Sequence, residues 1–299
     1  MRGVRAIRMI RHGAPLVEED IADPKPRAGE VLIEIRAAGI CHSDAHYRRD
    51  PTRVSAPRIL GHEIAGVIAG TQRRVAVDYL FDDGRMIGKE VDGGFAEKIV
   101  VPAANAIPIP DNISFEQAAI MMCSTATAYH ALRLALLQPG ESVGILGFGG
   151  LGISALLLAR RLGAGAVHVF EKMPEKAELA KKLGATIGGE KLDVALDFIG
   201  NTNLVLEALR NLAPRGRLVL VAINLRDIRF DAYADVLAKE RRIIGCSDHT
   251  REELLELMEM DLDLSCAITR RVPRQAKAVN GVLDELERGT AHLRTVIVN

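Results

Sequence analysis

The chain has 299 residues, of which 48% are hydrophobic and 26% charged, and its 39 basic residues balance its 39 acidic ones. That length allows two domains with sizeable cores, and a net charge of zero predicts no nucleic-acid partner and no electrostatic membrane anchor. The apolar runs are too short to span a bilayer and no signal-peptide pattern is visible, so we expect a cytoplasmic protein without membrane partners. The four widely spaced cysteines are typical of metal ligands or buried thiols rather than of a disulfide framework.

Short β-type runs punctuated by glycine and proline fill roughly the first 124 residues. Strands are expected at residues 31–35, 64–68 and 97–101. Many short strands separated by turn signals favour a barrel-like β domain.

From about Glu141 the pattern changes to strands that alternate with helices. Helices are expected at residues 150–161 and 174–183, the second with Pro174 in its first turn. Strands are expected at residues 142–146, 166–170, 194–198, 217–221 and 242–244. This alternation predicts a parallel, doubly wound sheet and an α/β fold class.

The C-terminal segment combines helix and strand signals. Thr250 and Glu253 form a capping box that opens a helix through Met258, and a helix at 277–288 and a strand at 295–298 follow. Because this segment is too small to fold alone, we expect it to pack on the first part. The predicted domains are therefore 1–124 with 250–299, and 125–249.

Three residues far apart in the chain have the types expected of ligands to one catalytic zinc. Cys41 lies in GICHSD (39–44), His62 in GHE (61–63) and Cys123 in MCSTAT (122–127). Two thiolates and one imidazole leave the fourth tetrahedral position open, which distinguishes a catalytic zinc from a structural one. Each residue alone is more often a buried thiol or an ordinary histidine, so the prediction depends on their combination.

A glycine-rich loop follows the expected strand at 142–146 and opens the expected helix at 150–161. Its sequence matches G-x-G-x-x-G in the strand–turn–helix context of dinucleotide-binding loops. The residues predicted to hold a pyrophosphate are Gly147, Gly149, Gly150, Leu151 and Gly152. The alternative is a glycine turn formed only for packing.

Glu171 ends the second expected strand of this region, 19 positions after the last glycine of the loop. A carboxylate here accepts hydrogen bonds from the adenosine ribose and repels a 2′-phosphate, which favours NAD over NADP. Lys172 weakens this inference, because a lysine attracts a phosphate. A solvated charge at the strand end is the other interpretation of Glu171.

These segments together resemble the zinc-dependent medium-chain alcohol dehydrogenases over nearly the whole chain. The resemblance rests on GICHSD, GHE, DGGFAE (92–97), PDNISFEQAA (110–119), Cys123, the glycine loop and LRT (293–295). It implies a GroES-like, β-barrel-type catalytic domain and a Rossmann cofactor domain. It also implies a homodimer or homotetramer that acts on a small alcohol, aldehyde or ketone.

The resemblance further implies roles for residues around the metal. Cys41, His62 and Cys123 match the zinc ligands, and Glu63 matches an acidic residue that can approach the zinc. Asp44 matches the carboxylate that orients the histidine ligand. Ser43 matches the hydroxyl beside the zinc-bound oxygen, and His46 the far end of a proton relay. The ordinary alternatives are that Ser43 and Asp44 cap a turn and that His46 lies on the surface.

For the cofactor, the resemblance implies that His42 and Arg294 contact the pyrophosphate and that Thr127 packs near the nicotinamide. Arg294 has the alternative of a solvated strand charge. The sequence leaves open whether Tyr47 and the Arg48-Arg49 pair border the substrate cleft or face solvent.

The chain departs from the family pattern in two places. The segment from Asp78 to Asp92 is short and has no cysteine, so we expect one catalytic zinc and no structural zinc. The stretch from residue 61 to 75 is also shortened, which predicts a more open substrate cleft.

The leading prediction is an NAD-dependent alcohol dehydrogenase. Zinc would lower the pKa of the alcohol, hydride would pass to the nicotinamide, and the proton would leave through Ser43, the cofactor ribose and His46. The alternative within enzymes is a polyol or sugar dehydrogenase, which typically has an acidic third ligand in place of Cys123. The alternative from another class is a non-catalytic nucleotide-binding sensor or structural protein.

Overall fold

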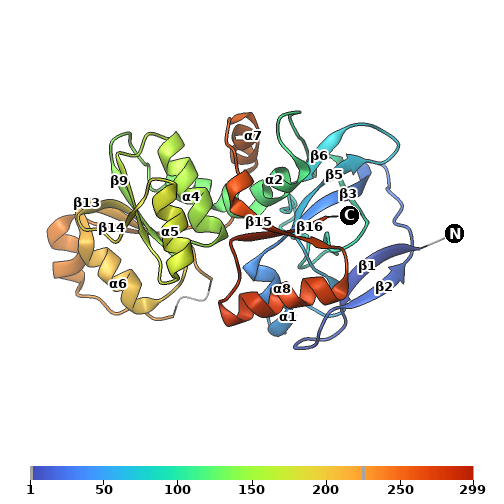
Figure 1. Cartoon of the computed structure of the whole chain (residues 1–299), viewed down its shortest axis with the longest axis horizontal. Helices are drawn as coiled ribbons and strands as arrows, with labels where there is room; N and C mark the ends of the chain where they lie inside the picture. Colours follow the sequence, from blue (N-terminus) through green and yellow to red (C-terminus); the bar gives the residue numbers. More distant parts are fainter. Residues whose placement is uncertain (1–2, 224–225, 299) are drawn as a thin grey trace. The chain divides into compact units, whose positions relative to one another are not determined.

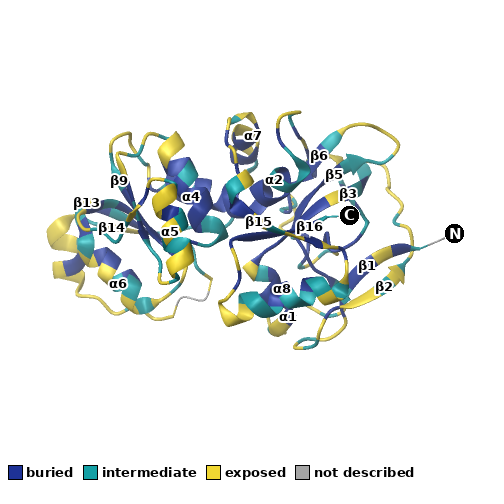
Figure 2. Cartoon of the chain, viewed as in Figure 1, coloured by how far each residue is buried: buried dark blue, intermediate teal, exposed yellow. Residues whose placement is uncertain are grey.

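The chain forms two compact units in a computed structural model that describes residues 3–223 and 226–298 (Figure 1). The first unit comprises Met1–Cys123 and Leu254–Asn299, and the second comprises Ser124–Glu253. Buried residues concentrate on the central strands of each unit, whereas exposed residues lie on helix faces, on loops and on the strands Val17–Ile21 and Arg242–Gly245 (Figure 2).

The first unit is built around a long strand, β3 (Glu30–Ile40), which pairs antiparallel with three other strands: β5 (Glu63–Ile68), β7 (Lys98–Pro102) and β16 (Arg294–Val298). The seven-stranded sheet is completed by β6 (Arg74–Val77), β8 (Ala106–Pro108) and β15 (Ile268–Pro273). A separate three-stranded sheet contains β1 (Val4–Met9), β2 (Val17–Ile21) and β4 (Arg58–Ile59). The helices are α1 (His42–Arg49), α2 (Phe115–Ile120) and α8 (Ala276–Arg288).

The strands predicted in the first unit are confirmed, with shifted ends. The strand expected at 31–35 is the N-terminal half of β3, which extends to Ile40 because residues 37–40 are also buried and paired. The shortened stretch is a tight hairpin between β5 and β6, closed by the Ile68 N–H that donates to the Arg73 carbonyl at 3.0 Å. The prediction does not include six strands of this unit, which show no clear alternation: β1, β2, β4, β6, β8 and β15.

The second unit is a six-stranded sheet in which every neighbouring pair is parallel. Its order is β11-β10-β9-β12-β13-β14, so the direction of winding reverses between β9 and β12. The strands are β9 (Ser142–Leu146), β10 (Ala166–Phe170), β11 (Thr186–Ile187), β12 (Leu192–Asp197), β13 (Leu212–Leu220) and β14 (Arg242–Gly245). In such sheets, ligands bind outside the carboxyl ends of the strands at the point of reversal.

Helices connect the strands of the second unit and cover the sheet. α4 packs on β9 and β10, α5 on β10 and β11, and α6 on β12 and β13. The helices are α3 (Ala126–Leu134), α4 (Gly150–Arg161), α5 (Pro174–Lys182) and α6 (Thr202–Asn211). The predicted parallel α/β sheet is therefore confirmed, and β9, β10 and α4 have the predicted bounds.

The capping box is also confirmed. The Glu253 N–H donates to Thr250 Oγ1 at 3.3 Å, and Glu253 Oε2 accepts from the Thr250 N–H at 2.9 Å. It opens α7 (Arg251–Glu259). Within residues 3–223 and 226–298, no helix has the length and apolar character needed to cross a membrane.

Candidate functional site

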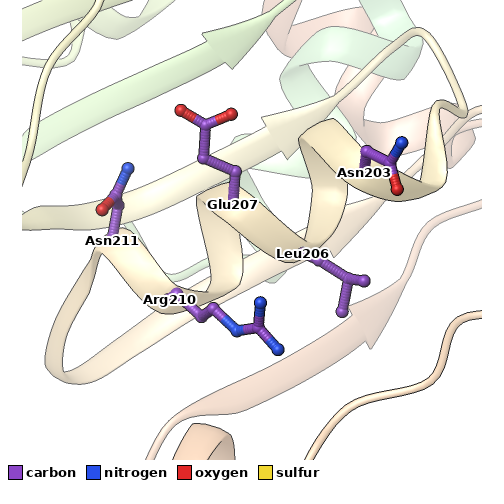
Figure 3. Close-up of a pocket in the computed structure, with 5 residues that line it drawn as sticks. All are labelled: Asn203, Leu206, Glu207, Arg210 and Asn211. Carbon is purple, nitrogen blue, oxygen red and sulfur yellow. The ribbon is translucent and has the colours of Figure 1, made fainter.

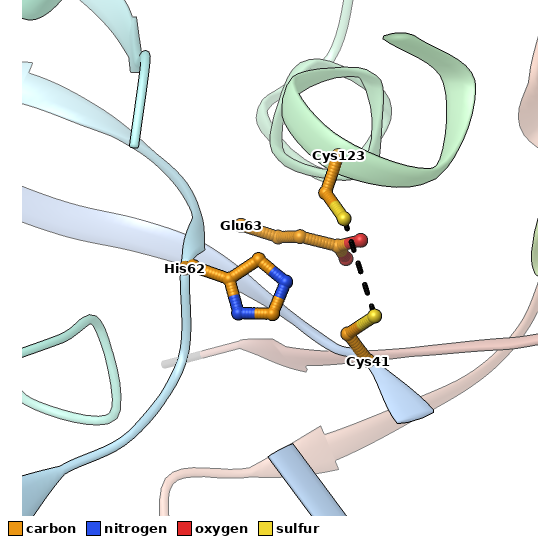
Figure 4. A group of neighbouring side chains, drawn as sticks. All are labelled: Cys41, His62, Glu63 and Cys123. Atoms are coloured by element: carbon orange, nitrogen blue, oxygen red, sulfur yellow. Dashed lines mark hydrogen bonds between the residues drawn. The ribbon is translucent and has the colours of Figure 1, made fainter. Parts of the chain in front are cut away.

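Four buried side chains that can ligate a metal point toward one another in the first unit (Figure 4). The ligand atoms of Cys41, His62, Glu63 and Cys123 all lie within 4.8 Å of one another, and each residue is at most 8% exposed. Across the described ranges, no other group of three such side chains comes this close. Three of the four are the predicted zinc ligands.

The four residues come from three separate segments of the chain. Cys41 lies between β3 and α1, and His62 immediately precedes β5, which Glu63 begins. Cys123 lies in the π-helical turn η2 (Met121–Thr125), between α2 and α3. Single π turns within helices are rare and occur frequently at functional sites.

Gly39 makes room for the carboxylate in this cluster. It is paired with Glu63 in the β3–β5 ladder. A Cβ atom at Gly39 would lie 1.9 Å from Oε2 of Glu63, which is closer than two atoms can approach. A larger residue at position 39 would therefore displace the Glu63 carboxylate from its observed place.

The two sulfur atoms are spaced for one shared metal. Sγ of Cys41 and Sγ of Cys123 are 4.0 Å apart, about twice the length of a disulfide bond. Two thiolates that each lie about 2.3 Å from a tetrahedral zinc are about 3.8 Å apart. The hydrogen bond between the thiols lowers the pKa of Cys41 and raises the pKa of Cys123, so the pair holds a proton that a cation would displace.

Asp44 approaches the imidazole of His62 and also fixes the local backbone. Its Oδ1 lies 3.4 Å from Nδ1 of His62 and accepts from the Gly61 N–H at 3.1 Å, and its Oδ2 accepts from the Cys41 N–H at 2.9 Å. Burial disfavours a charge on His62, but Asp44 and Cys41 raise its pKa well above the usual range. With Nδ1 facing Asp44, Nε2 is the ring nitrogen available to a metal.

Glu63 and Arg294 form a buried ion pair at the edge of the cluster. Nη2 of Arg294 donates to Oε2 of Glu63, and both side chains are at most 4% exposed. Burial raises the pKa of Glu63 to about 7, although Arg294 opposes that shift. Oε1 of Glu63 is buried and makes no hydrogen bond with the described residues, which leaves a negatively polarised oxygen beside the thiols.

The remaining predicted residues of the first unit lie on α1. Oγ of Ser43 is 3.7 Å from Sγ of Cys41, which places a hydroxyl next to the cluster. The rings of His42 and His46 are stacked, with centroids 4.7 Å apart. His42 is exposed and His46 is half-buried. Burial lowers the pKa of His46, and His42 and Arg53 lower it further.

In the second unit, the glycine loop lies between β9 and α4, at the reversal point of the sheet. A Cβ atom at Gly152 would lie 2.1 Å from the carbonyl oxygen of Gly147, whereas a Cβ atom at Gly149 would meet nothing within 4 Å. Gly152 therefore allows close packing, and Gly149 borders open space. Gly150 and Leu151 form the first turn of α4, whose N–H groups suit an anion.

Glu171 lies next to the glycine loop and is held by backbone N–H groups. Its Oε2 accepts from the Phe148 N–H at 3.0 Å, and its Oε1 accepts from Lys172 at 2.7 Å and from Met173 at 2.9 Å. Lys172 itself is exposed. Thr127 is buried on α3, and its carbonyl oxygen lies 4.0 Å from Sγ of Cys246.

Sequence reasoning missed several buried polar and aromatic groups. Tyr79 packs edge-on against His62, with ring centroids 5.2 Å apart. Asp197 ends β12 with one oxygen bonded to the N–H groups of Ile199 and Gly200. An acidic residue at a strand end followed by glycine was a usable signal for Asp197, but nothing in the sequence places Tyr79 beside the histidine.

A shallow hollow of about 420 Å³ lies on one face of α6 (Figure 3). Its lining residues all belong to that helix: Asn203, Leu206, Glu207, Arg210 and Asn211. It contains none of the predicted site residues and has no cluster of metal ligands or nucleophiles. We therefore assign it no function.

Two family models match the chain. The alcohol dehydrogenase GroES-like domain matches residues 27–111, and the zinc-binding dehydrogenase domain matches residues 150–261. The first match covers the cluster segments around Cys41 and His62, and the second begins within the glycine loop.

Whole-length similarity is also present. An alcohol dehydrogenase from Geobacillus stearothermophilus is 31% identical, with 95% of this chain and 96% of the relative aligned. An NAD-dependent alcohol dehydrogenase from Sulfurisphaera tokodaii is 28% identical, with 99% of this chain and 100% of the relative aligned. The structure of a zinc-binding dehydrogenase from Sinorhizobium meliloti 1021, bound to NADP, has a TM-score of 0.89 at 22% identity over the full length of both chains.

Proposed function

The chain belongs to the zinc-type medium-chain alcohol dehydrogenases, and from this premise we propose that it transfers a hydride between an alcohol and NAD with one zinc ion per chain. The observation that carries the proposal is the buried group of Cys41, His62 and Cys123, with its sulfur atoms 4.0 Å apart. The first unit would be the catalytic domain and the second the cofactor domain.

The proposed metal centre assigns a task to each residue around it. Cys41, His62 and Cys123 would hold the zinc, and Asp44 would orient His62 through Nδ1. When bound, the zinc supplies a Lewis acid that lowers the pKa of an alcohol, and the nicotinamide accepts the hydride. Glu63 would place its free Oε1 beside the metal while Arg294 holds its other oxygen.

The proton would leave along α1. Ser43 has its hydroxyl beside Cys41, where it can take the proton of a substrate alcohol. His46 is three residues further along the helix and half-buried, and its lowered pKa keeps it neutral and able to accept that proton at pH 7. His46 would then release it to solvent.

We further propose that NAD is preferred over NADP. Glu171 supports this preference, because its carboxylate is held beside the glycine loop by three backbone N–H groups. A 2′-phosphate at this position would meet a fixed negative charge. Gly147 to Gly152 would hold the pyrophosphate, His42 and Arg294 would contact it, and Thr127 would pack near the nicotinamide.

The cellular context is also a proposal. A reducing cytoplasm would keep Cys41 and Cys123 as thiols that can bind a metal. We expect a homodimer or homotetramer, and light scattering coupled to size-exclusion chromatography measures the assembly directly.

A panel of substrates tests the proposed function. Purified protein is supplied with primary alcohols, secondary alcohols and polyols, and NADH or NADPH formation is followed at 340 nm. We expect turnover of simple alcohols with NAD. A strong preference for polyols would favour the sugar dehydrogenase alternative, and cofactor binding without turnover of any alcohol or carbonyl would favour the non-catalytic one.

A further inference from the structure

The helix that carries the proposed proton path is short and needs an external support. α1 has eight residues, and helices of this length are only marginally stable on their own. The helix begins directly after Cys41, and it contains Ser43, Asp44 and His46. Any tilt of α1 would therefore displace a metal ligand and both groups of the proton path together.

Arg48 in the last turn of α1 anchors this helix to α8. Its guanidinium is 7% exposed and donates from Nη2 to Asp284 Oδ1 at 2.7 Å and to Glu287 Oε1 at 2.7 Å. Nε also donates to Glu287 at 3.2 Å, so the guanidinium of Arg48 bridges two carboxylates that lie one turn apart on α8. In the chain, these partners lie more than 230 residues away.

The loop between β1 and β2 contacts both α1 and α8 at the same place. The Asn280 side chain on α8 accepts from the Leu16 N–H at 2.8 Å and donates to the Leu16 carbonyl at 2.9 Å. The Gly13 N–H donates to the carbonyl oxygen of Arg48 at 2.9 Å. The end of α1 is thus held by α8 on one side and by the loop between β1 and β2 on another, and Arg48 takes part in both contacts.

We propose that Arg48 is a positioning residue that sets the orientation of α1, and through it the placement of Cys41, Ser43 and His46. This inference rests on the proposed function, because it assigns Arg48 a task in that reaction. A buried guanidinium with two carboxylate partners fixes direction as well as distance, since its five N–H donors have a rigid planar geometry. Among the described residues, the side-chain hydrogen bonds of Arg48 all go to α8 and none goes to the metal cluster, so Arg48 would act through the helix.

Arg270 provides a matched control for the test. It is on β15 and also pairs with α8, through two hydrogen bonds of 2.9 Å to Glu285, and among the described residues it makes no hydrogen bond or ion pair with α1. Arg48→Met removes contacts to two carboxylates of α8, Asp284 and Glu287, and Arg270→Met removes the contact to one, Glu285. Only the first is expected to loosen the helix that carries the proton path.

The experiment compares the two variants in three measurements on zinc-loaded protein: kcat for alcohol oxidation, the solvent deuterium isotope effect on kcat, and the rate of zinc transfer to a chelating dye. For Arg48→Met we expect kcat to fall by about 10- to 100-fold with a smaller change in KM, because misplacing reacting groups by about 1 Å has effects of that size. The isotope effect should rise, because proton transfer becomes slower, and zinc release should be about tenfold faster. Arg270→Met should match the wild type in all three.

Two further variants keep the test decisive if Arg48→Met does not fold. Glu287→Gln removes the charge of one partner of Arg48, at a side chain that is 29% exposed. It should change kcat, the isotope effect and the zinc-release rate in the same direction as Arg48→Met, but by less. Arg48→Lys should restore part of kcat, because an ammonium can reach one carboxylate but cannot span both. Equal melting temperatures, kcat values, isotope effects and zinc-release rates in the Arg48 and Arg270 variants would overturn the proposal.

The zinc-release measurement separates this proposal from the proposed function. If the wild type oxidises no alcohol, the proposed function fails. Faster zinc release from Arg48→Met than from Arg270→Met would still support the positioning of Cys41 by Arg48, and equal rates would contradict it.

Discussion

The two units build their candidate sites from different parts of the chain. In the first unit, side chains from three separate segments converge: Cys41, His62, Glu63 and Cys123 are buried together. In the second, the candidate site is a run of backbone between β9 and α4, with Glu171 held by backbone N–H groups. The candidate metal site therefore depends on long-range assembly, whereas the candidate cofactor loop depends on local backbone shape.

The largest expected effect comes from removing one atom in the first unit. Ser43→Ala deletes the hydroxyl that lies 3.7 Å from Sγ of Cys41. Alcohol oxidation should fall by roughly 10²-fold, the scale of positioned proton transfer. Zinc content and NADH binding should be retained, because neither depends on this hydroxyl.

His46→Gln is compared with Ser43→Ala by measuring steady-state rates of alcohol oxidation across pH. Water can replace the outer end of a relay, so its effect should be smaller and small buffer bases should restore part of the rate. Wild-type turnover by zinc-loaded Ser43→Ala would mean that the proton leaves by another route.

A pair of glycine substitutions tests the corresponding claim for the second unit. Gly149→Ala places a methyl group in open space, so the melting temperature should be unchanged, but NADH binding should weaken by about tenfold because the methyl group would crowd the pyrophosphate. Gly152→Ala forces the methyl group against the Gly147 carbonyl, so it should destabilise the fold by about 1–3 kcal/mol.

Thermal denaturation and fluorescence titration with NADH measure both effects. NADH binding by Gly149→Ala as tight as that of the wild type would contradict a pyrophosphate site at this loop and would mean that the loop is a packing turn.

The smallest expected effect concerns the choice of cofactor. The wild type should use NAD at least about tenfold more efficiently than NADP, which corresponds to roughly 1.4 kcal/mol. Glu171→Ala should narrow this ratio, because the fixed carboxylate beside the glycine loop is lost. The kcat/KM values of both proteins with NAD and with NADP measure this preference. Equal kcat/KM values of the wild type with the two cofactors would contradict the role of Glu171 and indicate that Lys172 binds the 2′-phosphate.

Much of the second unit was predictable because its signals are local. Strand β9, the glycine loop and helix α4 are consecutive, and each pattern is contained within a short window. The first unit is different. The residue types at Cys41, His62 and Cys123 indicated a metal site, but the sequence contains no local signal that Arg294 contacts Glu63 or that α8 anchors Arg48. These contacts follow from the pairing of β16 with β3 and from the packing of α8 on α1.

Zinc stoichiometry tests the central claim most directly. Elemental analysis of wild-type protein, reconstituted with zinc and freed of excess metal, should give about one equivalent per chain. Cys123→Ala treated in parallel should lose most of it, because one of three protein ligands is gone, while Cys246→Ala should retain it as the control for removal of a thiol. Two tightly bound equivalents in the wild type, or full retention of zinc by Cys123→Ala, would contradict a single metal held by Cys41, His62 and Cys123.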